Sequence, residues 1–220
     1  MRETVKKFFI QETELCILLA LKSVKALYGI CLDSTETMTQ EELCYNLFNM
    51  QKKGIIDRRA DSDVFCIEEE LDSCIERIRT AARFIVLADA DELVSEKYFY
   101  VAREGAVILE AAGQYDTGNA GAFHLEAVTE AVMWDRIRES GFVMETANGS
   151  VPAEVLERAQ GCWQEDKDTI LRHATVEKLL QEYDVHTHCK IKQCIRMSCG
   201  LDTYLVCSSG GVNIEGGEKS

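Results

Sequence analysis

The alternation of apolar and polar positions near the start of the chain predicts two helices. Between Gln11 and Leu27 the apolar residues are so dense that the helix would be buried on more than one face. In a second helix, Thr39 stands at the N-cap, Glu42 occupies the capping-box position, and Gly54 is the stop signal. The inner stripe of this second helix is expected at Leu43, Leu47 and Met50.

A short hairpin is predicted directly after Gly54. Ile55-Ile56 and the run 64–67 are apolar, and they flank the polar segment 58–63. Two helices followed by a hairpin give residues 1–66 the element order of a winged helix. We therefore expect a winged-helix-like N-terminal segment.

The next part of the chain predicts an acidic amphipathic helix that leads into a hairpin. The helix covers 67–82 and places Leu71, Ile75, Ile78 and Ala82 on one stripe. The β-prone runs 98–101 and 106–109 follow, and Gly105 supplies the positive φ that their turn requires. Between helix and hairpin, the apolar run 83–87 fits either a strand or the end of the helix.

The same order of helix and hairpin is predicted again near the end of the chain. A helix over 165–182 would carry Ile170, Ala174, Val176, Leu179 and Leu180 inward. Strands at 191–195 and 203–206 follow, the first inside a longer alternating run over 186–197. The duplication predicts an α+β fold with a pseudo-twofold antiparallel sheet.

Turn-forming residues divide the chain between these two units. The segment 113–121 reads as a loop, and a helix from Ala122 is expected to use Leu125, Val128 and Val132. After the break at Asn148-Gly149, Pro152 suits the first turn of a helix that runs to Ala159. The predicted division is therefore a winged-helix-like segment 1–66, two helix-hairpin subdomains at 67–148 and 149–208, and a flexible tail at 209–220.

Composition and charge narrow the range of partners. The chain has 220 residues, 46% of them hydrophobic, and only one proline, so closely packed subdomains are expected in place of long linkers. Its formal charge of −14 opposes the counterion release that drives most nucleic-acid binding. Nucleic acid is therefore not an expected partner.

The distribution of apolar residues predicts a cytoplasmic protein. The apolar run 16–20 is too short for a membrane span or a typical secretory signal. In a chain without a signal peptide, Cys16, Cys44, Cys66 and Cys74 lie inside apolar patterns and are expected to be reduced thiols of the core. No membrane partner is expected.

A candidate metal strip comes from the pair His186-Thr187-His188. On a strand both imidazoles would share a face, and the same parity reaches Cys194. Lys190 and Lys192 share that parity and would repel a cation. A solvated polar face is therefore the preferred interpretation, no metal or cofactor is expected, and a zinc-binding protein remains an alternative.

The other candidate chemistry does not form a recognisable motif. Asp89, Asp91 and Glu92 lack the central glycine and further oxygen ligands of a calcium loop. His124 and Glu126 would not form a dyad on a helix, the cysteines and histidines show no nucleophile signature, and the glycines of 113–121 match no phosphate loop. We therefore expect a non-enzymatic protein.

The winged-helix-like segment leaves a second function open. The exposed side of its helix offers Gln40, Glu41, Glu42 and Asn46 in place of a basic strip. Lys52, Lys53, Arg58 and Arg59 gather only at the helix end and in the hairpin, where they could contact phosphate. A winged-helix transcriptional regulator is therefore the main alternative to a protein-binding use of the segment.

The order of elements resembles the EspG family. The resemblance comes from the N-terminal helix Gln11-Glu-Thr-Glu-Leu-Cys-Ile-Leu-Leu-Ala20, the segment from Leu47 to Gly54 with the hairpin after it, and the two related halves of helices and paired strands. Members of that family are cytosolic chaperones of type VII secretion, with a quasi-twofold α+β fold that grips the helical tip of a secreted protein. The resemblance implies a chaperone or adaptor that shields an apolar surface of such a protein. The hairpins over 98–109 and 204–206 are expected to build the sheet that supports the binding site.

Overall fold

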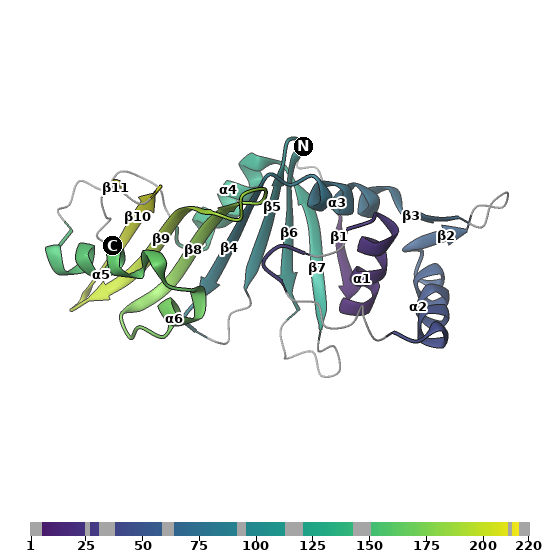
Figure 1. Cartoon of the computed structure of the whole chain (residues 1–220), viewed down its shortest axis with the longest axis horizontal. Coiled ribbons are helices and arrows are strands. Elements are labelled where there is room, and N and C mark those ends of the chain that lie inside the picture. Colours follow the sequence, from purple (N-terminus) through teal and green to yellow (C-terminus); the bar gives the residue numbers. More distant parts are fainter. Residues whose placement is uncertain are drawn as a thin grey trace. The chain divides into compact units, whose positions relative to one another are not determined.

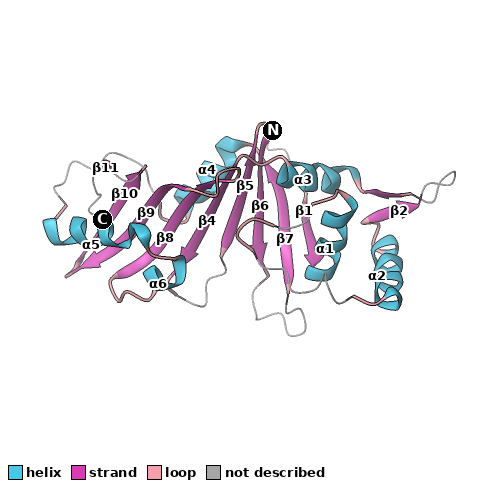
Figure 2. Cartoon of the chain, in the orientation of Figure 1, coloured by secondary structure: helices cyan, strands magenta, loops and turns pink. Residues whose placement is uncertain are grey.

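The computed structural model confirms an α+β fold dominated by antiparallel strands (Figures 1 and 2). It describes residues 6–24, 27–30, 38–58, 64–91, 96–112, 121–142, 151–210 and 213–215. The chain forms two compact units. Unit 1 contains Met1–Ala81 and Tyr100–Thr129, and unit 2 contains Ala82–Phe99 and Glu130–Ser220.

Unit 1 combines three helices with an antiparallel group of strands and a separate hairpin. Its elements are β1 (Lys7–Gln11), α1 (Glu12–Leu21), α2 (Gln40–Lys52), β2 (Ile56–Arg58), β3 (Phe65–Ile67), α3 (Glu69–Arg79), the end of β5 (Lys97–Ala102), β6 (Gly105–Ala111) and β7 (Ala122–Val128). Strand β7 pairs with β1 on one side and with β6 on the other, both antiparallel. The predicted hairpin after Gly54 is confirmed as β2 and β3.

Local sequence signals account for the helices of unit 1. In α2, Thr39 Oγ1 accepts a hydrogen bond from the Glu42 backbone N–H, and the Glu42 side chain accepts one from the Thr39 N–H, which confirms the predicted capping box. Gly54 follows the helix at φ +71°, and the Ile55 N–H donates to the Met50 carbonyl oxygen at 2.9 Å. This is the glycine-closed helix end that the sequence predicts.

Helix α3 places its apolar stripe against the strands of unit 1. Leu71, Ile75 and Ile78 are buried as predicted, and α3 contacts β6 and β7. Ala82, the fourth residue of the predicted stripe, is exposed because α3 ends at Arg79. The Glu68 side chain caps the helix by accepting a hydrogen bond from the Leu71 N–H. Acidic residues in the first turn and Arg77 and Arg79 in the last suit the helix dipole.

Unit 2 is a meander of antiparallel strands with four short helical segments. Its elements are β4 (Arg83–Asp89), the start of β5, α4 (Glu130–Glu139), α5 (Ala153–Gly161), the 3₁₀ helix η1 (Cys162–Gln164), α6 (Lys167–Leu171), β8 (Val176–Asp184), β9 (Lys190–Cys199), β10 (Asp202–Ser209) and β11 (Asn213–Glu215). The strand order is β4-β8-β9-β10-β11, and each neighbouring pair is antiparallel. Val155 and Ala159 of α5 and Ile170 of α6 pack in one core with buried side chains of β8, β9 and β10.

The predicted helix over 165–182 is wrong. Helix α6 ends at Leu171, and Val176–Asp184 forms the strand β8, which pairs with β4 and β9 (Figure 2). Leu179 and Leu180 point to opposite faces of that strand, and both are buried. A strand buried on both faces does not alternate, so its apolar residues can also fit a helical spacing. Each repeat is therefore a helix, a strand and a hairpin: α3, β4 and β5-β6, then α6, β8 and β9-β10.

Three further segments form strands that the sequence pattern did not predict as such. The helix expected from Ala122 is wrong, because Ala122–Val128 is the strand β7 and α4 begins only at Glu130. The undecided run 83–87 is strand β4. Part of the predicted tail is also a strand, since Asn213–Glu215 pairs with β10, and the rest of 211–220 lies outside the described residues.

The predicted start of α5 and the predicted order of the N-terminal elements are present in the structure. Helix α5 begins directly after Pro152, which takes the N-cap position. The order α1, α2 and β2-β3 is present, and its likeness to a winged helix remains a prediction. Among the helices in the described ranges, none has the length and apolar character needed to cross a membrane.

Candidate functional site

A groove on unit 1 is the best candidate for a partner-binding site. It has a volume of about 590 Å³ and is lined by Leu21, Lys22, Val64, Phe65, Cys66, Ile67, Glu69 and Asp72. These residues come from the end of α1, from β3 with the residue before it, and from the first turn of α3. We call it the α1–β3 groove.

The hairpin and the cap of α3 fix the wall of this groove. Strand β3 pairs with β2 in a separate two-stranded sheet, with Cys66 opposite Asp57. The Glu68 N–H donates to the Ile55 carbonyl oxygen at 2.9 Å, and this hydrogen bond fixes the backbone between β3 and the start of α3. The wall is therefore built from regular backbone, which favours a preformed site.

Apolar side chains are exposed at the groove. Val64 is 60% exposed and Leu21 is 42% exposed, while Phe65, Cys66 and Ile67 are half-buried. Covering such side chains is favourable by about 25 cal/mol per Å² of apolar surface removed from water. Exposed apolar residues that gather at one hollow are typical of a binding site, whereas scattered ones are not.

The rim of the groove is charged. Lys22 Nζ lies 2.6 Å from an Asp72 carboxylate oxygen, and Glu69 lines the same groove. Lys6 pairs with Glu68 at 2.6 Å. Burial raises the pKa of Glu68, but the Lys6 ammonium and the Leu71 N–H outweigh that effect, so its pKa lies below the usual value. Glu68 is therefore ionised at neutral pH and paired with Lys6.

Helix α2 adds a second exposed apolar surface to unit 1. Of its predicted inner stripe, Met50 is buried, Leu47 is half-buried and Leu43 is exposed. On its outer side, Tyr45 is 68% exposed and Phe48 is 65% exposed. Residues 45 and 48 are neighbours on a helix surface, so these two aromatic rings form one patch.

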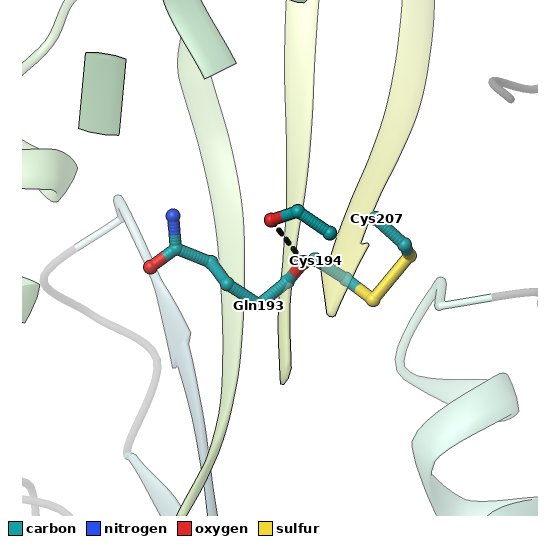
Figure 3. Close-up of a disulfide and its surroundings, with 4 residues drawn as sticks. Gln193, Cys194 and Cys207 are labelled. Atoms are coloured by element: carbon teal, nitrogen blue, oxygen red, sulfur yellow. Dashed lines mark hydrogen bonds between the residues drawn. A yellow bond between two sulfur atoms is a disulfide. The ribbon is translucent and has the colours of Figure 1, made fainter. Parts of the chain in front are cut away.

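The structure does not form the candidate metal strip, which the sequence supported only as an alternative. His186 and His188 lie in the turn between β8 and β9, and His188 has φ +57°, so neither residue is on the strand that would align them with Cys194. Cys194 is itself bonded to Cys207 (Figure 3). The alternation that predicted the strip holds only from Lys190, where β9 begins.

The disulfide lies outside the four cysteines that were expected to be reduced thiols of the core. Antiparallel pairing sets Cys194 of β9 directly opposite Cys207 of β10, with Cα atoms 4.0 Å apart. Gln193, the preceding residue, extends its amide away from the bond (Figure 3). Among the four cysteines expected in the core, Cys16 and Cys74 are buried, Cys66 is half-buried and Cys44 is exposed, and all four are free thiols.

Thiol counting tests this bond. In denaturant without reductant, we expect at least two fewer reactive thiols than the ten cysteines that react after reduction. Cys207→Ser should expose one thiol more than the unchanged protein in the unreduced assay, although it has one cysteine fewer, because Cys194 is released. A full count of ten before reduction would contradict the bond.

The other predicted site residues have structural partners. Asp89 ends β4 and lies 3.0 Å from Lys178 Nζ, and it accepts a hydrogen bond from the Asp91 N–H, while Glu92 lies outside the described residues. His124 is on strand β7, not on a helix, and its ring lies 5.3 Å from that of Phe9.

The basic residues considered for DNA contact are only partly available. Lys53 Nζ lies 2.6 Å from the buried carboxylate of Glu14, so its charge is already used within unit 1. Lys52 and Arg58 are exposed, and Arg59 lies outside the described residues. The outer side of α2 presents the exposed aromatic side chains of Tyr45 and Phe48. Such side chains suit contact with a protein better than contact with phosphate.

The two hairpins expected to support the site are core elements. Phe99, Tyr100 and Val101 of β5 and Val107 and Leu109 of β6 are buried, as are Leu205 and Val206 of β10. These strands were predictable from the sequence, whereas the α1–β3 groove was not. The one sequence signal for the groove was Val64, an apolar residue directly after the polar turn of the first hairpin.

Comparison with known proteins adds no family to this description. No protein-family model matches the chain, and a search of curated proteins finds no match.

Proposed function

We propose that this chain is a non-enzymatic protein-binding module of the cytoplasm, a chaperone or adaptor that covers an apolar segment of a helical partner. The α1–β3 groove carries the proposal, because Leu21 and Val64 are exposed at a hollow of about 590 Å³ with a charged rim. An apolar centre surrounded by polar residues is the usual anatomy of a protein interface.

The chemistry of the groove favours an amphipathic helix with basic flanks. Such a helix places apolar residues at spacings of three and four along one face and can lay that face in an apolar groove. At the rim, Glu69 and Asp72 outnumber Lys22. Basic residues beside the apolar face of the partner would therefore improve the charge complementarity and the association rate.

The exposed aromatic patch on α2 supports the same proposal. Tyr45 and Phe48 are exposed, and both belong to the aromatic residue types that are enriched at protein interfaces. With a secreted helical protein as the partner, the role would be that of a type VII secretion chaperone, as the resemblance to the EspG family implies.

An affinity purification from the native host tests the proposal through Val64→Asp. An apolar partner segment would have to desolvate the new carboxylate. We therefore expect the variant to recover at least about tenfold less of the partner than the unchanged protein does. Because Val64 is largely exposed, the change should leave stability within about 0.5 kcal/mol.

Leu201→Asp is the matched control. Leu201 is fully exposed in the turn between β9 and β10 of unit 2, outside the groove. The control should recover the same partner in the same amount as the unchanged protein. Equal recovery with Val64→Asp, or the absence of any protein partner at micromolar concentration, would overturn the proposal.

A further inference from the structure

Three side chains with metal-binding atoms lie together in unit 2, away from the residues considered above. The Cys162 Sγ, a Glu165 carboxylate oxygen and a His173 ring nitrogen all lie within 4.8 Å of one another. His173 Nε2 and Glu165 Oε2 are 2.9 Å apart. Two residues separate Cys162 from Glu165, and seven separate Glu165 from His173, so one local segment supplies all three side chains.

The backbone of this segment is held in place from within. Asp166 caps α6 by accepting a hydrogen bond from the Thr169 N–H at 2.8 Å, which turns the chain back after Glu165. The His173 N–H donates to the Ile170 carbonyl oxygen, and Ile170 and Cys162 are buried in the same core. The three side chains are therefore brought together by a fixed turn of the chain.

Strand β9 supports the segment from outside. Lys190 Nζ donates to the carbonyl oxygens of Trp163 and Glu165, at 2.7 and 3.3 Å, and to Gln193 Oε1 at 2.9 Å. Gln193 Nε2 donates to the Cys162 carbonyl oxygen at 3.3 Å. The ammonium group of Lys190 is therefore directed at carbonyl oxygens of the segment, and the backbone of Cys162 and Glu165 is anchored to the sheet.

Nucleophilic catalysis does not fit this arrangement. Burial, followed by the negative charge of Glu165, raises the pKa of the Cys162 thiol to about 11 in the metal-free chain, so a metal ion that binds there has to displace the thiol proton. A cysteine nucleophile needs the opposite shift and a histidine that takes its proton. Here His173 Nε2 is hydrogen-bonded to Glu165 Oε2 at 2.9 Å.

We propose that Cys162, Glu165 and His173 bind one zinc ion, with water as the fourth ligand. Sulfur, nitrogen and carboxylate oxygen are the ligand types of zinc, whereas calcium and magnesium prefer oxygen alone. In a tetrahedral site the ligand atoms lie roughly 3.5 Å apart, so small side-chain rotations close the present spacing. Glu165 and His173 are partly exposed, which gives the ion a path from solvent and leaves room for the water.

Metal binding by the purified full-length protein tests this site. We expect one equivalent of zinc per chain in competition with a chelating dye, and a thiolate-to-cobalt charge-transfer band when Co²⁺ replaces zinc. His173→Ala should weaken zinc binding at least about tenfold, because one of three protein ligands is lost. Glu165→Gln keeps the size of the side chain but removes the negative charge of a second ligand, and it should weaken zinc binding as well.

His186→Ala is the matched control, since His186 is an exposed histidine in the turn between β8 and β9. It should bind zinc as the unchanged protein does, and circular dichroism of all variants should show the same fold. Binding below one equivalent, binding that His173→Ala leaves unchanged, or loss through His186→Ala would each overturn the assignment. The absence of a cobalt charge-transfer band would exclude Cys162 as a ligand and overturn it too.

Discussion

Replacing Gly105 with alanine is expected to lower the free energy of unfolding by roughly 2–6 kcal/mol. Gly105 opens β6 with φ +124°, a backbone conformation that other residues rarely adopt. A Cβ atom there would lie 2.5 Å from the Val128 carbonyl oxygen and 3.2 Å from Arg77 Nη1. The first neighbour is backbone of β7, so the strand itself would have to move.

The loss should appear as a lower urea midpoint, and Gly54→Ala is the matched comparison. Gly54 also has positive φ, at +71°, but nothing lies within 4 Å of its Cβ position. Only the strained backbone then contributes, at about 1 kcal/mol. Equal losses in the two variants would show that the close approach to Val128 has no energetic effect.

Local signals predicted the parts of the fold in which short-range chemistry decides the structure. The capping box of Thr39 and Glu42, the glycine end at Gly54 and the positive φ at Gly105 all depend on residues within a few positions of one another. The stripe of α3 was predictable because one face is apolar and the other charged. Such features need no knowledge of the tertiary neighbours.

The strand β8 shows where this information ends. Its apolar residues lie on both faces because β4 and β9 pair with its two edges and neighbouring elements cover it. Gln181 is buried among them and donates to Gln193 of β9 at 2.8 Å, a partner twelve residues away. The Tyr183 hydroxyl donates to the Gln181 side-chain oxygen at 2.9 Å as well, so both ends of the buried amide have partners. The partner on β9 cannot be seen in the spacing of apolar residues, and that spacing alone favoured a helix.

The candidate sites were less predictable than the fold. The α1–β3 groove joins residues from 21 to 72, and spacing along the chain does not show that these meet. The histidines at 186 and 188 gave the stronger sequence signal but lie in a turn. Cys162, Glu165 and His173 were not singled out, because a glutamate as the middle ligand matches no familiar pattern of cysteine and histidine pairs.

Replacing Lys53 with methionine is expected to destabilise unit 1 by about 2 kcal/mol. The Glu14 side chain is 2% exposed, and its two oxygens accept hydrogen bonds from Lys53 Nζ at 2.6 Å and from the Gln11 N–H at 3.0 Å. Removing the ammonium leaves a buried carboxylate with one donor. The full cost of an unpaired buried charge is larger, but Lys53 is 45% exposed, so water can reach the site.

A double-mutant cycle separates the ion pair from general effects of the helix end. Glu14→Gln in the Lys53→Met background should recover part of the loss, because a neutral amide is easier to bury and can still accept from the Gln11 N–H. Lys52→Met removes the same charge from the neighbouring exposed position and should cost only about 0.5 kcal/mol, through the helix dipole. If Lys52→Met and Lys53→Met have equal urea midpoints, the Glu14 pair does not stabilise the contact between α1 and the end of α2.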